Sequence, residues 1–94
     1  MFIKNKIRIG VSMPDKIMIY GTDWCGDCKR AERFFDKYGV TYTKINIDHD
    51  NESKEFVIKT NNGKQIVPTI IFPDNSVLIE PSNKELAEKL NIKV

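Results

Sequence analysis

Short apolar runs separated by turn residues predict four β-strands in this chain. The runs are rich in β-branched and aromatic residues, and glycine, proline, asparagine or aspartate stands between them. In the second run Tyr42 alternates with Thr41 and Thr43, as in a strand whose two faces meet different surroundings. The last two runs flank a polar turn and predict a β-hairpin. The predicted strands cover residues 16–20, 40–47, 68–72 and 77–80.

Apolar residues at steps of three and four predict three helices. The first follows Cys25 and ends near Gly39, and the second begins near Asp48 or Asp50. The third begins at Ser82, which has a glutamate three residues later, the spacing of a capping box. We expect the phenylalanines to pack in the core and the charges of the first helix to face water. The phenylalanines are Phe34, Phe35 and Phe56, and the charges are Lys29, Arg30, Glu32 and Arg33.

These elements follow one another in the order β-α-β-α-β-β-α. A parallel β-α-β unit followed by a helix and an antiparallel hairpin gives a four-stranded mixed sheet with helices on both faces. The predicted fold class is therefore α/β, with the arrangement of the thioredoxin fold. Residues 1–13 are expected to form either an N-terminal extension or an extra edge strand, and residues 14–94 form the domain.

The composition indicates one small globular domain. The chain has 94 residues, of which 40% are hydrophobic and 30% charged, and its formal net charge is +2. It has no apolar run approaching the roughly 18 residues of a membrane helix, and no basic stripe for nucleic acid. The first residues are charged too often for a signal peptide. We expect a cytoplasmic monomer that binds neither membranes nor nucleic acids.

The two cysteines, Cys25 and Cys28, lie between the first strand and the first helix. In a reducing compartment such a pair is more often catalytic or metal-binding than structural. Cys25 is expected to be partly exposed at the helix N-terminus, where the dipole and free N–H groups stabilise its thiolate. Cys28, one turn later and more buried, can then resolve a mixed disulfide formed on Cys25.

Two other interpretations of the pair are weaker. A disulfide between residues this close in sequence closes too small a loop to stabilise the fold much. A zinc site would need a second cysteine pair, because His49 cannot complete four ligands. Thiol–disulfide exchange is therefore the preferred prediction, with no metal ligands.

Residues around the cysteines are candidates for substrate binding. Trp24 offers an apolar surface, and Gly26 leaves room for an approaching chain. Asp27 suits the first turn of a helix but disfavours a neighbouring thiolate, so it should favour positively charged partners. Pro68 begins a strand, where a proline costs no hydrogen-bond donor. In a thioredoxin fold it would be cis and face the cysteines, so that the backbone of Val67 can pair with an extended substrate.

Together these motifs resemble the glutaredoxins, and more closely their mycoredoxin branch. The matching segments are 22–28, 62–69 and 72–82. The resemblance implies a glutaredoxin-like domain over residues 14–94, with Cys25 as nucleophile, Cys28 as resolving thiol and Pro68 in the cis form. It also implies a reductase of mixed disulfides without a bound cofactor, whose co-substrate is a low-molecular-weight thiol such as glutathione, mycothiol or bacillithiol.

The chain also departs from the family pattern. Asp27 stands where the family usually has tyrosine, and Ile66 where threonine is common. The segment 80–83 replaces the Gly-Gly pair and aspartate of members that use glutathione. Ser82 is placed to cap the last helix or to present its N-terminus to a substrate carboxylate, and Gln65 is a candidate for the other end of the thiol.

These features are compatible with three functions. The first is a thiol–disulfide oxidoreductase that reduces protein disulfides or mixed disulfides through Cys25 and Cys28. The second is an electron donor to one enzyme, of the kind that serves ribonucleotide reductase, recharged by a thioredoxin-reductase-like flavoprotein. The third is an iron–sulfur or metal-binding module, which the second cysteine of the pair disfavours.

Overall fold

The computed structural model describes residues 16–93, so the predicted N-terminal segment 1–13 lies outside the described residues. Within this range the helices and strands follow the predicted order, with one additional short 3₁₀ helix, η1. The elements are β1 (Ile17–Gly21), α1 (Gly26–Lys37), β2 (Tyr42–Asn46), η1 (Ile47–His49), α2 (Asn51–Thr60), β3 (Thr69–Ile71), β4 (Val77–Ile79) and α3 (Asn83–Leu90).

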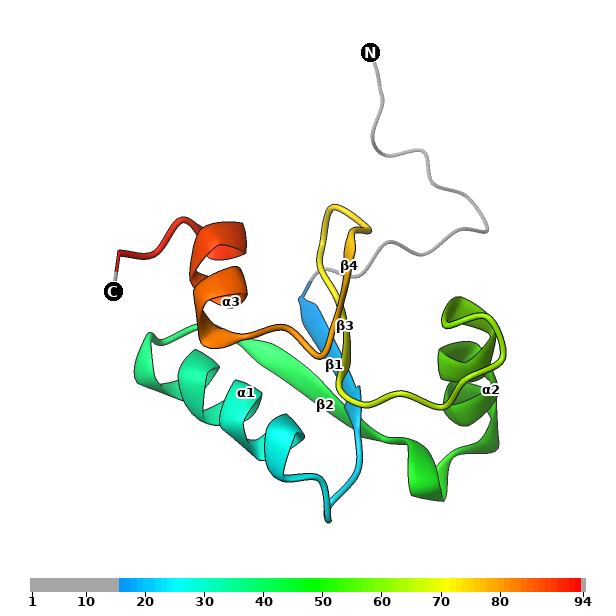
Figure 1. Cartoon of the computed structure of the whole chain (residues 1–94). Coiled ribbons are helices and arrows are strands. Elements are labelled where there is room, and N and C mark those ends of the chain that lie inside the picture. Colours follow the sequence, from blue (N-terminus) through cyan, green and yellow to red (C-terminus); the bar gives the residue numbers. More distant parts are fainter. Residues whose placement is uncertain (1–15, 94) are drawn as a thin grey trace.

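The four strands form one mixed sheet in the order β2-β1-β3-β4. β1 and β2 are parallel, with Ile19 opposite Lys44, whereas β1 with β3 and β3 with β4 are antiparallel. The predicted hairpin is therefore confirmed. β1 leads into α1, and β4 leads into α3, at the same end of the sheet (Figure 1). This end brings together two helix N-termini, where backbone N–H groups lack intrahelical partners.

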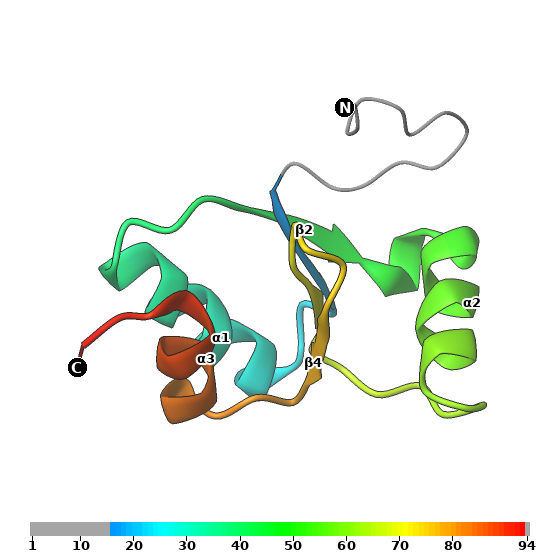
Figure 2. The ribbon, with the colours of Figure 1, turned by 90° about the horizontal axis from the view of Figure 1, so that it is seen from above.

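Helices cover both faces of the sheet, as predicted. α1 and α3 lie on one side and α2 on the other (Figure 2). The main core lies between the sheet and the pair α1 and α3, because these helices turn their apolar sides to the same face of β1 and β3. Each fully buried aliphatic or aromatic side chain there contributes about 1.5–3 kcal/mol. The core consists of Ile17, Ile19, Ala31, Phe34, Phe35, Ile70, Phe72, Leu86 and Ala87.

The charged side of α1 departs from the expectation that all its residues face water. Arg30 and Glu32 are half-buried, with side chains 26% and 18% exposed, whereas Lys29 and Arg33 are exposed. Glu32 forms an ion pair with Lys44 of β2, and Arg30 reaches the loop before α3. Helical periodicity could not reveal these contacts, because both partners come from distant segments.

The prediction that Phe56 packs in the core with the other two phenylalanines is wrong. Phe56 lies on α2, is 40% exposed, and has its ring centroid 5.0 Å from that of Tyr20 on β1. α2 packs on the opposite face of the sheet from α1, and it buries Val57 rather than its neighbour. Aromatic residues therefore occupy both sides of the sheet.

The helix starts differ in how their backbone N–H groups are bonded. Ser82 forms the predicted capping box with Glu85 at the start of α3. Asp50 precedes α2, but its carboxylate accepts a hydrogen bond from Ser53 Oγ at 2.6 Å and makes no cap bond to the backbone.

Within the described residues, none of the helices has the length and apolar character needed to cross a membrane.

Candidate active site

Cys25 and Cys28 occupy the first turn of α1, at the sheet end that also holds the start of α3. Cys25 is the N-cap residue, in an extended backbone conformation, and its Sγ accepts a hydrogen bond from the Cys28 N–H at 3.1 Å. Both thiols are free. A sulfur therefore takes the capping place that an oxygen usually fills, and a negative charge on it would strengthen the bond.

The expectation that Cys25 is partly exposed is wrong, since this residue is only 7% exposed. Its sulfur turns inward, toward the first turn of α1 and toward the carbonyl oxygen of Val67 at 4.0 Å. The contact spans 42 residues of sequence, so no local pattern could indicate it. The Val67 backbone is therefore a close neighbour of the Cys25 sulfur.

Cys28 is fully buried and packs against the end of β1. A Cβ atom at Gly21 would lie 2.7 Å from the Cys28 sulfur, so only glycine leaves room for the thiol there. Burial and the hydrogen bond with Cys25 raise the pKa of Cys28 to about 12, whereas the backbone of Thr22 and the charge of Lys44 act in the opposite direction. Cys28 is thus a protonated thiol at neutral pH, next to the sulfur of Cys25.

The Val67–Pro68 peptide bond is cis, and Pro68 is fully buried. The Pro68 carbonyl accepts a hydrogen bond from the Glu80 N–H at 2.9 Å, which fixes this segment to the end of β4. Among residues 16–93, no backbone–backbone hydrogen bond uses the N–H or the carbonyl of Val67. The segment beside Cys25 therefore keeps backbone groups without a backbone partner, as an edge strand does, and within this range the Val67 carbonyl accepts only the long hydrogen bond from Cys25 Sγ.

Two buried polar side chains, those of Asn61 and Thr69, fix the backbone around Val67 and Pro68. The Thr69 hydroxyl donates to the carbonyl of Ile66 at 2.8 Å. The amide of Asn61, at the end of α2, donates to the Thr69 hydroxyl at 3.1 Å and to the carbonyl of Val57 at 2.8 Å. α2 therefore helps to fix the backbone that lies opposite Cys25.

The remaining candidate residues differ in how firmly they are held. Trp24 is 70% exposed beside Cys25, and its indole N–H donates to Asp48 at 2.9 Å. Gly26 and Gln65 are also exposed, and a Cβ at Gly26 would contact nothing within 4 Å. Ser82 is exposed too, but its hydroxyl accepts a hydrogen bond from the backbone in the α3 cap.

Asp27 forms an ion pair within α1. Its carboxylate accepts two hydrogen bonds from Arg30, at 2.8 and 3.0 Å. Arg30 also donates to the carbonyl of Pro81 and to Asn83, both at 2.6 Å. The negative charge of Asp27 is therefore partly neutralised, and the start of α1 is tied to the start of α3.

Sequence reasoning missed several residues that shape the site. They make no recognisable motif, because their roles depend on contacts that form only in the folded protein. The sequence did contain one signal for Lys44. It lies two residues after Tyr42, so both side chains point to the same face of the strand, and Tyr42 packs against the core; a charged residue on that face is unusual. The missed residues are Gly21, Arg30, Lys44, Asn61 and Thr69.

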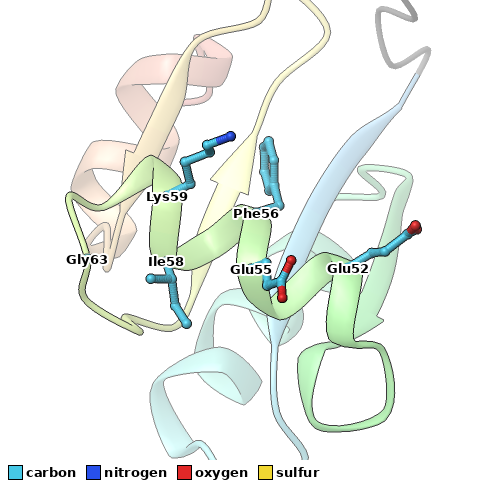
Figure 3. A pocket seen from close by; sticks show the side chains of 6 residues that line it. All are labelled: Glu52, Glu55, Phe56, Ile58, Lys59 and Gly63. Atoms are coloured by element: carbon cyan, nitrogen blue, oxygen red, sulfur yellow. The ribbon is translucent and has the colours of Figure 1, made fainter.

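Two surface hollows have no cysteine among the residues that line them. One hollow of about 530 Å³ is lined by residues of α2 and the turn after it, among them Phe56, Lys59 and Gly63 (Figure 3). Another, of about 330 Å³, lies between α1 and α3 and is lined by Arg33, Lys37 and Tyr38, among others.

In the part of the chain that the structure describes, no three histidine, cysteine, aspartate or glutamate side chains gather as metal ligands would.

Comparison with known proteins agrees with this geometry. Residues 17–77 match the family model described as glutaredoxin. A protein of Mycobacterium tuberculosis H37Rv that is named as a glutaredoxin is 38% identical over 74 residues, covering 79% of this chain and 88% of the relative. The chain belongs to the glutaredoxin family. The present chain is also 35% identical to mycoredoxin 1 of Corynebacterium glutamicum over 74 residues, covering 79% of this chain and 91% of that protein.

Solved structures show the same architecture. A glutaredoxin from Archaeoglobus fulgidus superposes with a TM-score of 0.66 at 25% identity, covering 80% of this chain and 85% of that one. A thioredoxin-like protein superposes with a TM-score of 0.73 at 20% identity, covering 85% of this chain and 100% of that one. The predicted thioredoxin fold is confirmed.

Proposed function

We propose that this glutaredoxin is a cytoplasmic thiol–disulfide oxidoreductase that acts as a monomer. It reduces protein disulfides or mixed disulfides with a low-molecular-weight thiol, and Cys25 and Cys28 carry the reaction. The supporting observation is the placement of the Cys25 sulfur, which is bonded at the start of α1, adjacent to Cys28 and 4.0 Å from the Val67 carbonyl. A nucleophile, a resolving thiol and a free backbone segment therefore meet at one place.

The reaction consists of two exchanges. The Cys25 thiolate attacks one sulfur of a substrate disulfide R–S–S–R′, forms Cys25–S–S–R and releases R′–S⁻. Cys28 then attacks Cys25 Sγ, the bond to R breaks, and its proton passes to the departing R–S⁻. The protein ends as a Cys25–Cys28 disulfide, and two equivalents of a small thiol, or a flavoprotein reductase, return it to the dithiol.

Substrate binding is assigned to both sides of the cysteines. The N–H and carbonyl of Val67, which have no backbone partner in the described part of the chain and lie next to cis Pro68, pair with an extended chain around the substrate sulfur, as in strand addition. Exposed Trp24 supplies apolar contact on the other side, and Gly26 leaves space above the helix start. Asp27, Gln65 and Ser82 are exposed and are proposed to contact the polar ends of the co-substrate.

Cysteine variants test this function. Mixed disulfides of a reporter protein with glutathione, mycothiol and bacillithiol are each offered to wild type, Cys25→Ser and Cys28→Ser, with the matching free thiol as reductant. Wild type is expected to release the small thiol, and Cys25→Ser to be inactive with all three. Turnover retained by Cys28→Ser assigns the route in which the small thiol resolves the intermediate, and turnover lost assigns the dithiol route.

Ser53→Ala serves as a matched control, because Ser53 lies on α2, where its hydroxyl bonds to Asp50 rather than to any group of the site. It should turn over like wild type. Activity that persists in Cys25→Ser, or wild-type protein inert with every disulfide, would contradict the proposed function.

A further inference from the structure

The resolving step faces an electrostatic barrier in this protein. Cys28 must attack as a thiolate, yet it is fully buried and its pKa is raised to about 12 by burial and by the hydrogen bond with Cys25. Creating a charge in such a place is costly unless an opposite charge or fixed donors lie beside it.

Lys44 is placed to supply that charge. It lies on β2 in register with Ile19 of β1, and paired residues on adjacent strands point to the same face of a sheet. Ile19 is buried in the core under α1, so the side chain of Lys44 also runs along the α1 face. Cys28 packs on Gly21, two residues after Ile19 and on the same face of β1.

Two carboxylates, from residues that precede and follow Cys28 in the sequence, hold the Lys44 ammonium. Its Nζ lies 3.0 Å from Glu32 Oε2 and 3.6 Å from Asp23 Oδ1. Glu32 follows Cys28 by one helical turn, so both project from the same side of α1. The Lys44 side chain is only 27% exposed, which limits screening of its charge by water.

We propose that Lys44 is a positioning residue that keeps a positive charge beside Cys28 and thereby promotes its ionisation in the resolving step. This inference rests on the proposed function. In that step the Cys28 S–H bond breaks, the new thiolate attacks Cys25 Sγ, and the Cys25–S–S–R bond gives the Cys25–Cys28 disulfide and R–S⁻. The proton goes to R–S⁻, while Lys44 remains protonated throughout.

The charges around the site agree with this role. Lys44 lowers the pKa of Cys28, in the same direction as the backbone of Thr22. Burial disfavours the ammonium, but the contacts with Glu32, Asp23 and Cys28 outweigh it and raise the pKa of Lys44. Beyond Glu32, the next charged neighbour on this face is Asp36, which bonds to Tyr42 of β2.

The test separates attack by Cys25 from attack by Cys28. Reduced full-length protein is mixed with excess 5,5′-dithiobis(2-nitrobenzoate) in a stopped-flow instrument, and release of the coloured thiolate is followed from pH 6 to 9. The first equivalent appears in a phase whose rate depends on reagent concentration and reports Cys25. The second appears in a unimolecular phase and reports Cys28.

Lys44→Met and Lys44→Gln are expected to slow the second phase roughly tenfold at neutral pH and to shift its profile about one unit upward. The first phase should change by less than about threefold, and Lys44→Arg should restore most of the second-phase rate. Lys89→Met is the matched control, because Lys89 pairs with exposed Asp74, a residue of the β3–β4 turn. It should leave both phases unchanged.

The outcomes distinguish this inference from the proposed function. A second phase of wild-type rate and pH profile in folded Lys44→Met and Lys44→Gln overturns the role of Lys44 alone. A wild-type protein that releases only one equivalent, or reacts no faster than free cysteine, overturns the proposed function. Circular dichroism confirms that each variant is folded, and using two neutral replacements keeps the test decisive if one of them unfolds.

Discussion

At the scale of single residues, the site depends on the close approach of the Gly21 backbone to the Cys28 sulfur. Gly21 ends β1, and the Cys28 sulfur occupies the space where a side chain would lie. Gly26 stands at the start of α1 with open space around it. Gly21 precedes the cysteine pair and Gly26 lies between its two members, but only Gly21 is required by packing inside the molecule.

Replacing Gly21 with alanine is therefore expected to destabilise the fold. The new Cβ would come within 2.7 Å of the Cys28 sulfur, so either the thiol or the strand must move. Overpacking of this kind costs roughly 1–3 kcal/mol in the free energy of unfolding. Urea denaturation of Gly21→Ala measures it, and Gly26→Ala should stay within about 0.5 kcal/mol of wild type. Equal stability of the two variants would refute this packing argument.

At the scale of the elements, Arg30 joins the two helices that frame the site. From α1 it binds Asp27 in the preceding turn and the carbonyl of Pro81 just before α3. Pro81 is fully buried, so its carbonyl needs a partner from the protein. Helix α3 is thereby positioned by a charged side chain as well as by its apolar contacts.

Arg30→Met should loosen this connection. The change removes a half-buried guanidinium and leaves the Pro81 carbonyl unsatisfied, which should lower the free energy of unfolding by about 1–3 kcal/mol. Arg33→Met, three residues later on the same helix and exposed, is the matched control and should change stability by less than about 0.5 kcal/mol. Thermal or urea unfolding of both variants provides the comparison, and a loss of similar size in each would refute the role of Arg30.

At the scale of the whole molecule, three groups between α1 and the sheet bind their protons more tightly in the folded state than outside it, as does Tyr20, whose ring lies against Phe56 of α2. Burial raises the pKa of Cys28 to about 12, and burial together with the Asp36 hydrogen bond raises that of Tyr42 to about 12. The pKa of Lys44 is raised as well, mainly by Glu32, against the effect of burial. All three lie along the contact between α1 and the strands β1 and β2.

Stability is therefore expected to fall in alkaline solution. Above pH 9, the ordinary pKa of a thiol, the unfolded chain begins to lose protons that the folded protein keeps, so the free energy of unfolding decreases as pH rises toward 12. Below about pH 8 these groups cause no pH dependence. Urea denaturation between pH 7.5 and 10.5 measures the effect, and Cys28→Ala and Tyr42→Phe should each reduce the slope. A flat or rising profile above pH 9 would contradict it.

Local patterns were sufficient to predict most of the fold. Apolar runs gave the four strands, the spacing of Ser82 and Glu85 gave the cap of α3, and the position of the cysteine pair placed it at the start of α1. These features depend on neighbours within a few residues, so they can be recognised in the chain. The strand predicted over 40–47 is shorter in the structure, because Ile47 begins the 3₁₀ helix.

By itself, then, the sequence determined the order of elements, the thioredoxin fold and the place of the cysteine pair at the start of α1. Only the tertiary structure decided that Cys25 is buried against Val67, that Arg30 binds Pro81, that Phe56 stays outside the main core and that Lys44 lies along the α1 face. The physical reason is distance along the chain. Charge, burial and hydrogen bonding at a site depend on segments that only folding brings together.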